Sequence, residues 1–281
     1  MADEPQTEAD REQYTHGYGA ASQYMATRSA GRQAAFFLPY MKAGMSLLDC
    51  GCGPGTITLG LAEAVAPGEV VGIDIGPSEV ERAIAFASEQ GVANARFEVA
   101  NSYQLPFPDS AFDAVFAHTL LEHLTDPDTA LAEMHRVLRP GGVIGVRDSD
   151  LGGLVINPHD ETILEFFKVR EQVWRSNGGN SRLGRQLAAM LRVAGFKRVQ
   201  ATASYDIYGN YENAETIREV GNIGEFFARY AESPQFTERA QEQGYADAET
   251  IGSFAKALRS WGNHPDSLWA SSNFEAVGWK E

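Results

Sequence analysis

Residues 48–55 read Leu-Asp-Cys-Gly-Cys-Gly-Pro-Gly, which joins the end of an apolar strand to a glycine-rich turn. Pro54 suits the first turn of a following helix, where its missing N–H is not needed. A second apolar strand ends at Asp74, 25 positions after Asp49 (74 − 49). This strand–turn–helix–strand order brings bare backbone close to a flat ligand and sets a carboxylate where a ribose diol would lie. The stretch therefore predicts an enzyme that binds a nucleoside cofactor.

The identity of the nucleoside depends on Asp49 and on the spacing of the glycines. A dinucleotide fingerprint reads Gly-x-Gly-x-x-Gly, whereas the glycines here are Gly51, Gly53 and Gly55, and position 56 is Thr. A carboxylate beside the turn repels a pyrophosphate but attracts an ammonium and a sulfonium group. The residues favour S-adenosylmethionine over NAD and leave a nicotinamide oxidoreductase as the weaker alternative.

Short apolar segments alternate with helical patterns from residue 45 to about residue 148. Uninterrupted apolar runs rich in β-branched or aromatic residues suit strands that are covered on both faces. We expect such strands at 45–49, 70–74, 95–100, 112–117 and 143–148, and further strands at 197–205 and 269–280. The alternation predicts an α/β fold with a doubly wound, mostly parallel sheet.

Several segments lie outside this alternation. Residues 1–13 are polar and acidic and are expected to form a disordered leader. Residues 14–44 precede the first strand and are expected to form a helical lid. Residues 159–177 and 212–262 are expected to be helical insertions over one edge of the sheet, so that 14–281 forms a single domain.

The net charge of the chain is −15. Nucleic-acid binding draws most of its affinity from Lys and Arg, and the sequence has no local basic cluster, so a nucleic-acid partner is disfavoured. No apolar run approaches the ~20 residues that span a bilayer. Cys50 and Cys52 share one turn, and no set of residues has metal-ligand spacing. We expect a cytoplasmic protein without a metal; its oligomeric state stays open, with a homodimer as one option.

Four segments in order resemble the successive motifs of one enzyme family. They are residues 48–55, Val-Gly-Ile-Asp at 71–74, Leu-Pro-Phe-Pro-Asp-Ser-Ala-Phe-Asp at 105–113 and Val-Leu-Arg-Pro-Gly-Gly at 137–142. The series resembles class I S-adenosylmethionine-dependent methyltransferases, above all their ubiquinone/menaquinone-biosynthesis-like small-molecule branch, over roughly residues 35–205. The resemblance implies a Rossmann-like sheet of seven strands, six parallel and one antiparallel. It also implies S-adenosylmethionine as the cofactor and S-adenosylhomocysteine as its product.

The resemblance further implies roles for residues around the cofactor. The turn that contains Gly51 and Gly53 lies under the adenosine and methionine parts, and Asp49 lies near the ammonium group. Asp74 accepts hydrogen bonds from the ribose diol. His118, just past the fourth strand, lies beside the methionine part.

The adenine end of the cofactor is assigned in the same way. Ile75 packs on the adenine ring. Asn101 and Ser102 stand where the family usually has Gly-Asp-Ala, whose Asp receives the adenine amino group. The amide oxygen of Asn101 can still accept that hydrogen bond, with a loss of ~1 kcal/mol because the acceptor is uncharged.

Methyl transfer is an in-line displacement at a carbon bonded to a sulfonium sulfur, for which the cofactor supplies the activation. Positioning of the nucleophile alone supplies ~7–11 kcal/mol, and a base adds ~10²–10⁴-fold only where the nucleophile must lose a proton. The candidates for catalysis are Tyr14, His16, His118 and His123. The candidates for substrate binding are Tyr18, Tyr24, Arg147, Asp148 and Trp174. For each of them a purely structural role is the alternative.

The sequence thus predicts a methyltransferase that acts on a small, partly apolar metabolite, with carbon, nitrogen or oxygen as the acceptor atom. Two alternatives stay open. A binding or assembly protein would hold the cofactor without turnover. A protein methyltransferase would need an open acidic groove and not a pocket buried beneath the helical segments.

Overall fold

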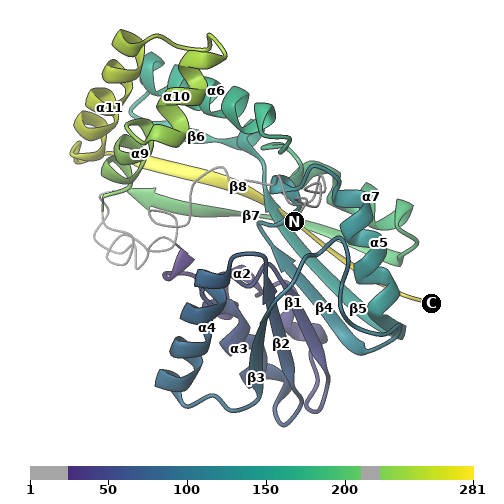
Figure 1. Ribbon diagram of the computed structural model, residues 1–281. Helices are drawn as coiled ribbons and strands as arrows, with labels where there is room; N and C mark the ends of the chain where they lie inside the picture. Colours follow the sequence, from purple (N-terminus) through teal and green to yellow (C-terminus); the bar gives the residue numbers. More distant parts are fainter. Residues whose placement is uncertain (1–24, 210–221) are drawn as a thin grey trace, which may run out of the picture.

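The computed structural model describes residues 25–209 and 222–281. Tyr14, His16, Tyr18 and Tyr24 lie outside the described residues, as does the expected leader at 1–13. The described chain forms an eight-stranded sheet with helices on both faces and a cluster of helices beyond one end (Figure 1). The predicted α/β class with a mostly parallel sheet is confirmed.

Five strands form the parallel part of the sheet. They are β1 (Leu47–Cys50), β2 (Val70–Asp74), β3 (Ala95–Val99), β4 (Phe112–His118) and β5 (Leu138–Ser149). Their spatial order is β3-β2-β1-β4-β5, and each neighbouring pair is parallel. The winding direction reverses between β1 and β4, so a crevice for a ligand is expected beyond the carboxyl ends of these two strands.

Three further strands extend the sheet. The strand β8 (Leu268–Trp279) runs antiparallel to β5 on one side and to β7 (Lys197–Gly209) on the other. The short β6 (Val155–Asn157) lies on the same side of β8 as β5. It pairs with the first residues of β8, whereas β5 pairs with the later ones. The sheet therefore contains the seven expected strands plus β6, which is too short to produce a recognisable apolar pattern.

Two strand boundaries differ by more than two residues from the sequence-based expectation. The strand β7 continues to Gly209, beyond the expected end at Tyr205, because its last residues pair with the start of β8. The strand β5 begins at Leu138, before the expected start at Val143, and directly follows the helix α5 (Pro127–Val137).

Helices cover both faces of the parallel strands. On one face lie α2 (Ala30–Gln33), α3 (Thr56–Val65) and α4 (Pro77–Gln90), and the short η2 (Leu38–Tyr40) follows α2. On the other face lie α5, α7 (Leu187–Val193) and the preceding η5 (Gly184–Gln186). Leu47 packs on the first side and Leu48 on the second, because successive strand side chains point to opposite faces.

The remaining helices form what we call the helical lobe: α6 (Glu161–Ser176), α9 (Ile223–Ala231), α10 (Pro234–Glu242) and α11 (Ala248–Gly262). The lobe has its own apolar core, in which the ring of Phe166 contacts aromatic rings from α9, α10 and α11. The ends of β7 and β8 reach this core through Tyr208 and Trp269. Figure 1 shows the lobe at one end of the long β7–β8 pair and the C-terminus at the other end. The assignment of 14–281 to one domain stays a prediction.

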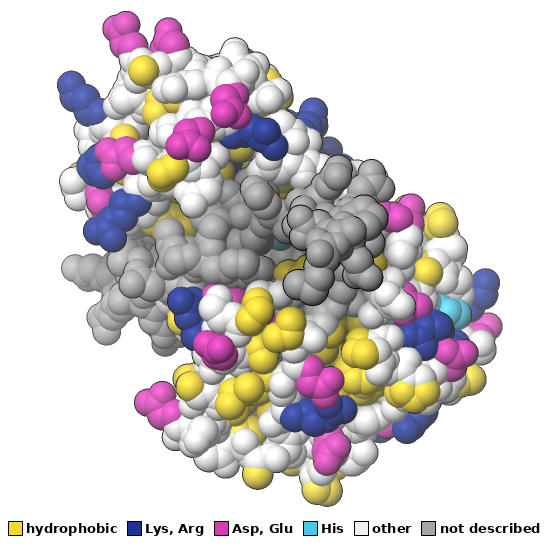
Figure 2. Space-filling model, viewed as in Figure 1, with side chains coloured by type: hydrophobic (Ala, Val, Ile, Leu, Met, Phe, Trp, Pro, Cys, Tyr) yellow, Lys and Arg dark blue, Asp and Glu magenta, His cyan; other side chains and the backbone are white. Residues whose placement is uncertain are grey.

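The surface charges are mixed in sign. Figure 2 shows acidic and basic side chains interspersed over the described part of one face. On the helical lobe, Arg259 forms ion pairs with both Glu225 and Glu232. Within 25–209 and 222–281, no helix is long and apolar enough to cross a membrane.

Candidate functional site

The first of two cavities lies where the carboxyl ends of β1, β2 and β4 meet. Every residue predicted to bind the cofactor lines it, namely Asp49, Gly51, Gly53, Asp74, Ile75, Asn101, Ser102 and His118. Met25 and Arg28, from the segment before α2, also contribute to its wall. The fold therefore brings the predicted residues together, while their individual roles stay predictions.

The glycine turn is held by main-chain contacts that leave its backbone facing this cavity. The N–H groups of Gly51 and Cys52 donate to the carbonyl of Ile73 at 2.8 and 2.9 Å. The φ angles of Gly51 and Gly53 are +74° and +51°, a left-handed region that side chains with a Cβ disfavour. The turn therefore needs glycine for its own conformation and presents little side-chain bulk to a ligand.

Asp74 ties the end of β2 to this turn. One carboxylate oxygen accepts from the N–H of Gly53 and the other from the N–H of Gly76, each at 2.9 Å. Burial raises the pKa of Asp74, and the backbone hydrogen bonds from Gly76 and Gly53 partly oppose that change. Because each carboxylate oxygen has more than one acceptor site, Asp74 retains the capacity to accept from a ligand hydroxyl.

Asp49 lies beneath the turn and is almost fully buried. Its carboxylate accepts from the hydroxyl of Thr58 at 2.6 Å. Burial raises the pKa of Asp49 to about 7; the Thr58 hydrogen bond lowers it and the charge of Asp74 raises it. A cation would stabilise two such carboxylates, whereas a pyrophosphate would repel both. The chemistry of the cavity therefore fits the ammonium and sulfonium groups of S-adenosylmethionine.

The part of the cavity that is predicted to hold adenine contains an apolar side chain and an amide. Ile75 is 45% exposed, which gives a flat base an apolar surface to cover. The amide oxygen of Asn101 accepts from the N–H of Tyr103 at 2.9 Å, so the side chain is oriented before any ligand binds.

A second cavity lies between the carboxyl ends of β4 and β5 and the helical lobe. Its lining combines aromatic side chains (Trp174, Phe226, Phe227, Trp269), charged side chains (Arg28, Glu122, Arg147, Arg170, Asp206) and small polar ones (Thr119, Ser149, Ser271, Asn273). It shares four lining residues with the first cavity: Arg28, His118, Thr119 and His123. The two cavities therefore meet at the end of β4.

Of the predicted substrate-binding residues that are described, Arg147 and Trp174 line the second cavity, and Asp148 lines neither cavity. Side chains alternate along a strand, so Arg147 and Ser149 face the cavity while Asp148 points to the opposite side. Asp148 is fully buried and accepts from the N–H of Glu122 at 3.2 Å. Burial and the nearby charge of Glu122 raise its pKa well above the usual range. The position of Asp148 thus favours support of the loop after β4.

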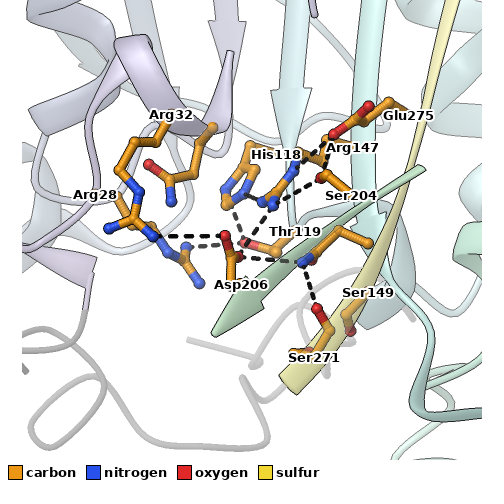
Figure 3. Close-up of polar contacts among 12 residues, drawn as sticks. Arg28, Arg32, His118, Thr119, Arg147, Ser149, Ser204, Asp206, Ser271 and Glu275 are labelled. Carbon is orange, nitrogen blue, oxygen red and sulfur yellow. Dashed lines mark hydrogen bonds and ion pairs between the residues drawn. The ribbon is translucent and has the colours of Figure 1, made fainter. Parts of the chain in front are cut away.

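Arg147 of β5 is the centre of a buried polar network that links this strand to three others (Figure 3). Its guanidinium contacts Asp206 of β7 at 3.0 Å and Glu275 of β8 at 3.4 Å. A third contact, at 2.8 Å, joins it to Nε2 of His118 at the end of β4. Two carboxylates therefore compensate the buried cation, and the wall of the second cavity is fixed before a substrate arrives.

The contact with Arg147 defines the protonation of His118. A guanidinium only donates, so Nε2 of His118 must accept, and the proton of the neutral ring then lies on Nδ1. Burial lowers the pKa of His118 well below its usual value, and the charges of Arg28 and Arg147 lower it further. In this arrangement the lone pair of His118 is already engaged, which argues against its predicted role as a base.

His123, the other described histidine candidate, stacks on Trp174 with ring centroids 4.8 Å apart. Burial lowers the pKa of His123 to about 3, with further contributions from Arg170 and Arg28. The indole N–H of Trp174 donates to the carbonyl of Glu122 at 3.2 Å, and Arg170 lies over the indole ring. His123 is therefore neutral near pH 7 and forms part of a packed wall.

Several site residues were not predicted from the sequence. For Thr119 and Glu122 a local signal exists, because they follow closely after a predicted strand end. Arg28, Arg170 and Asp206 come from three segments far apart in the chain. No local pattern distinguishes them from ordinary surface charges, because only the tertiary fold brings them together.

The parallel sheet, its reversal point and the acidic cavity at that point are the features of a Rossmann-like enzyme fold. A family model described as "Methyltransferase domain" matches residues 41–190, which is more than half of the chain. The chain belongs to this methyltransferase family. The predicted dependence on S-adenosylmethionine and the predicted small-molecule branch agree with this membership and with the relatives that follow.

Two curated relatives and one solved structure illustrate the similarity. The probable methyltransferase ltbC of Aspergillus luteorubrus is 40% identical over 282 residues, covering 95% of this chain and 97% of that protein. Demethylmenaquinone methyltransferase of Geobacillus stearothermophilus is 32% identical, covering 57% of this chain and 74% of that protein. The Haemonchus contortus phosphoethanolamine N-methyltransferase 2, solved with phosphomonomethylethanolamine and S-adenosylhomocysteine, shares the fold with a TM-score of 0.58. It is 18% identical and covers 97% of this chain and 59% of that chain.

Proposed function

We propose that this enzyme transfers a methyl group from S-adenosylmethionine in the first cavity to a small, partly apolar metabolite in the second. The observation that carries the proposal is the set of four residues that line both cavities: Arg28, His118, Thr119 and His123. When bound, the cofactor supplies a methyl group activated by the sulfonium. The residues of the chain would hold the two molecules in line and exclude water, which accounts for most of the expected rate enhancement.

The proposed orientation of the cofactor follows the chemistry of the first cavity. Asp74 would accept from the ribose hydroxyls, and Ile75 would cover the adenine, with Asn101 and Ser102 at its edge. Asp49 would face the ammonium group, which favours the ionised form of a carboxyl with a raised pKa. The methyl group would then point toward His118 and the second cavity.

The proposed substrate is small because it must fit between the strand ends and the side chains that the helical lobe contributes to the second cavity. The rings of Trp174, Phe227 and Trp269 supply an apolar wall, and Arg147 supplies a fixed polar group. A cavity lined by side chains of both the sheet and the helical lobe favours a metabolite over a protein side chain. Tyr18, Tyr24, Tyr14 and His16 stay proposed contacts of an N-terminal lid outside the described residues.

We further propose a cytoplasmic enzyme with no nucleic-acid partner. The net charge of −15 opposes binding to a polyanion, and both cysteines are free and buried, which suits a reducing compartment. A homodimer is the proposed assembly if the N-terminal segment crosses to a second copy. Light scattering of the purified full chain tests the assembly.

The first experiment is calorimetry of the full chain with S-adenosylhomocysteine and, separately, with NAD. Binding of S-adenosylhomocysteine alone supports the assignment of the first cavity. Binding of NAD in its place contradicts it. Methyl transfer from labelled cofactor is then measured against phenols, indoles and quinols.

The second cavity is tested by Trp174→Phe, which removes the N–H that donates to Glu122 but keeps an aromatic ring against His123. We expect KM for the substrate to rise by ~5-fold, equivalent to ~1 kcal/mol of lost ring contact, because the smaller ring reduces the apolar wall of the cavity, with unchanged affinity for S-adenosylhomocysteine. Trp261→Phe is the matched control, because Trp261 of the helical lobe donates to the carbonyl of Asn157 in β6 and lines neither cavity. Equal effects of the two variants on KM would argue against the second cavity as the substrate site.

A further inference from the structure

Thr119 stands at the junction of the two cavities in a backbone conformation that its residue type disfavours. Its φ angle is +48°, and a β-branched residue at positive φ is a genuine outlier that ordinary turns avoid. The N–H of Thr119 donates to the carbonyl of Arg147 at 2.7 Å, which helps to hold this conformation. Strained residues of this kind cluster where a side chain must point at a ligand.

The hydroxyl of Thr119 already receives two hydrogen bonds (Figure 3). Arg28 donates to Oγ1 from Nη1 at 2.9 Å. Nδ1 of His118 lies 3.3 Å from the same oxygen and carries the proton, because Nε2 accepts from Arg147. Both lone pairs of the Thr119 oxygen are then occupied, so its own proton is left to donate. Thr119 lines both cavities, so a ligand bound at their junction can accept that proton.

The charged and titratable side chains that line the second cavity are Arg28, His118, Glu122, His123, Arg147, Arg170 and Asp206. Of the two carboxylates, Asp206 accepts from Arg147 and Asn273, and Glu122 accepts from the N–H and hydroxyl of Ser149. The lone pair of His118 is taken by Arg147. The junction therefore offers hydrogen-bond donors and positive charge to a ligand, and its described carboxylates are already engaged.

We propose that the methyl acceptor is an acidic hydroxyl, a phenol or a carbonyl-conjugated enol, which binds as its oxyanion and accepts a hydrogen bond from Thr119. The inference rests on the proposed function and names its substrate class. The hydroxyl gives its proton to bulk water before it binds, so no base is needed in the cavity. The oxyanion then donates its electron pair to the methyl carbon, and the pair from the broken carbon–sulfur bond stays on sulfur. The products are a neutral methyl ether or enol ether and S-adenosylhomocysteine.

The first test compares Thr119→Val with Thr119→Ser in the full chain. Valine keeps the branched shape and the strained backbone but lacks the donor, whereas serine keeps the donor. We expect kcat/KM for an acidic phenol to fall by ~10–100-fold in Thr119→Val, the usual value of a hydrogen bond to a charged oxygen, and by less than ~3-fold in Thr119→Ser. The affinity for S-adenosylhomocysteine should change little in either variant. Equal losses in the two variants would overturn the role of the hydroxyl.

The second test needs no variant and therefore does not depend on folding of a mutant. The wild-type enzyme is assayed with substituted phenols of similar shape whose pKa values run from well below to well above neutral. We expect the pH at which kcat/KM reaches its plateau to move with the pKa of each phenol, because only the oxyanion binds productively. A single inflection shared by all phenols would reveal a base on the enzyme and overturn the inference.

The outcomes also separate this inference from the proposed function. Methyl transfer to amines or carbon acids, with no transfer to any phenol or enol, would overturn the acidic-hydroxyl substrate and leave the methyltransferase assignment intact. Absence of S-adenosylhomocysteine binding would instead contradict the assignment of the first cavity.

Discussion

The two cavities are built in different ways although they meet at one strand end. The first is lined by short segments that directly follow β1, β2, β3 and β4, and its turn is fixed by main-chain hydrogen bonds. The second draws on α6, α9, β7 and β8 as well, and its polar wall depends on charges that lie far apart in the chain. Arg147 and Glu275, for example, are separated by 128 positions. The cavity proposed for the cofactor thus depends on local backbone, and the cavity proposed for the substrate depends on side-chain assembly.

The largest expected effect concerns the backbone of the first cavity. Gly53→Val places a β-branched residue at φ +51° in the turn that lines the first cavity. We expect the affinity for S-adenosylhomocysteine to fall by ~1,000-fold or more, equivalent to ~4 kcal/mol, because strain and bulk act together. Calorimetry measures the loss.

Gly91→Val is the matched control for Gly53→Val. Gly91 also has a positive φ, +67°, but it ends α4 and has open space around it. We expect this variant to lose stability while it keeps its affinity for S-adenosylhomocysteine. Comparable loss of affinity in both variants would mean that backbone strain, and not contact with the cofactor, explains the result.

The second prediction concerns the polar network of the second cavity. Glu275→Ala removes a buried carboxylate that contacts Arg147 and accepts from Thr202 and Ser204. Leaving a buried cation with one of its two carboxylates should lower the free energy of unfolding by ~3 kcal/mol. Urea denaturation of the variant and the wild type measures the change.

The control for Glu275→Ala is Glu232→Ala on the helical lobe, which breaks an exposed ion pair with Arg259. Exposed pairs contribute little to stability, so this variant should unfold close to the wild type. If Glu275→Ala lowered the free energy of unfolding as little as Glu232→Ala, the polar network of the second cavity would not depend on charge compensation. The proposed difference between the two cavities would then be wrong.

The smallest expected effect is a pH dependence of cofactor binding. The pKa of Asp49 is raised to about 7, so the carboxyl is protonated below that pH and ionised above it. The ammonium group of S-adenosylhomocysteine is attracted only to the ionised form, and its affinity should rise by up to ~10-fold, about 1.4 kcal/mol, as the pH increases through 7. In Asp49→Asn we expect this rise to disappear. A rise of the same size in Asp49→Asn would assign the titration to another group.

The raised pKa of Asp49 also affects the stability of the fold. Stability should fall as the pH rises, whereas the affinity for S-adenosylhomocysteine should rise. Between pH 4 and pH 7 the folded chain binds the Asp49 proton more tightly than the unfolded chain, so the contribution of this group to stability falls as the pH rises through that window. Comparison of urea denaturation at several pH values in the wild type and in Asp49→Asn isolates that contribution.

The sequence alone determined the fold class and the cofactor cavity. Apolar runs and helical patterns determine the order of strands and helices, and parallel strands put their carboxyl ends on one edge. Asp49, Asp74 and Asn101 follow from that rule, because each lies at or beside a strand end in the chain itself. All the predicted cofactor residues accordingly line one cavity.

Only the tertiary structure decided which side chains line the substrate cavity and in which protonation state. Asp148 was expected beside Arg147, but strand alternation buries it on the other side. His118 was a candidate base, yet Arg147 occupies its lone pair. The physical reason is one of range: backbone conformation is set by neighbours in sequence, whereas burial, hydrogen-bond partners and charge compensation depend on residues that only folding brings within a few ångströms.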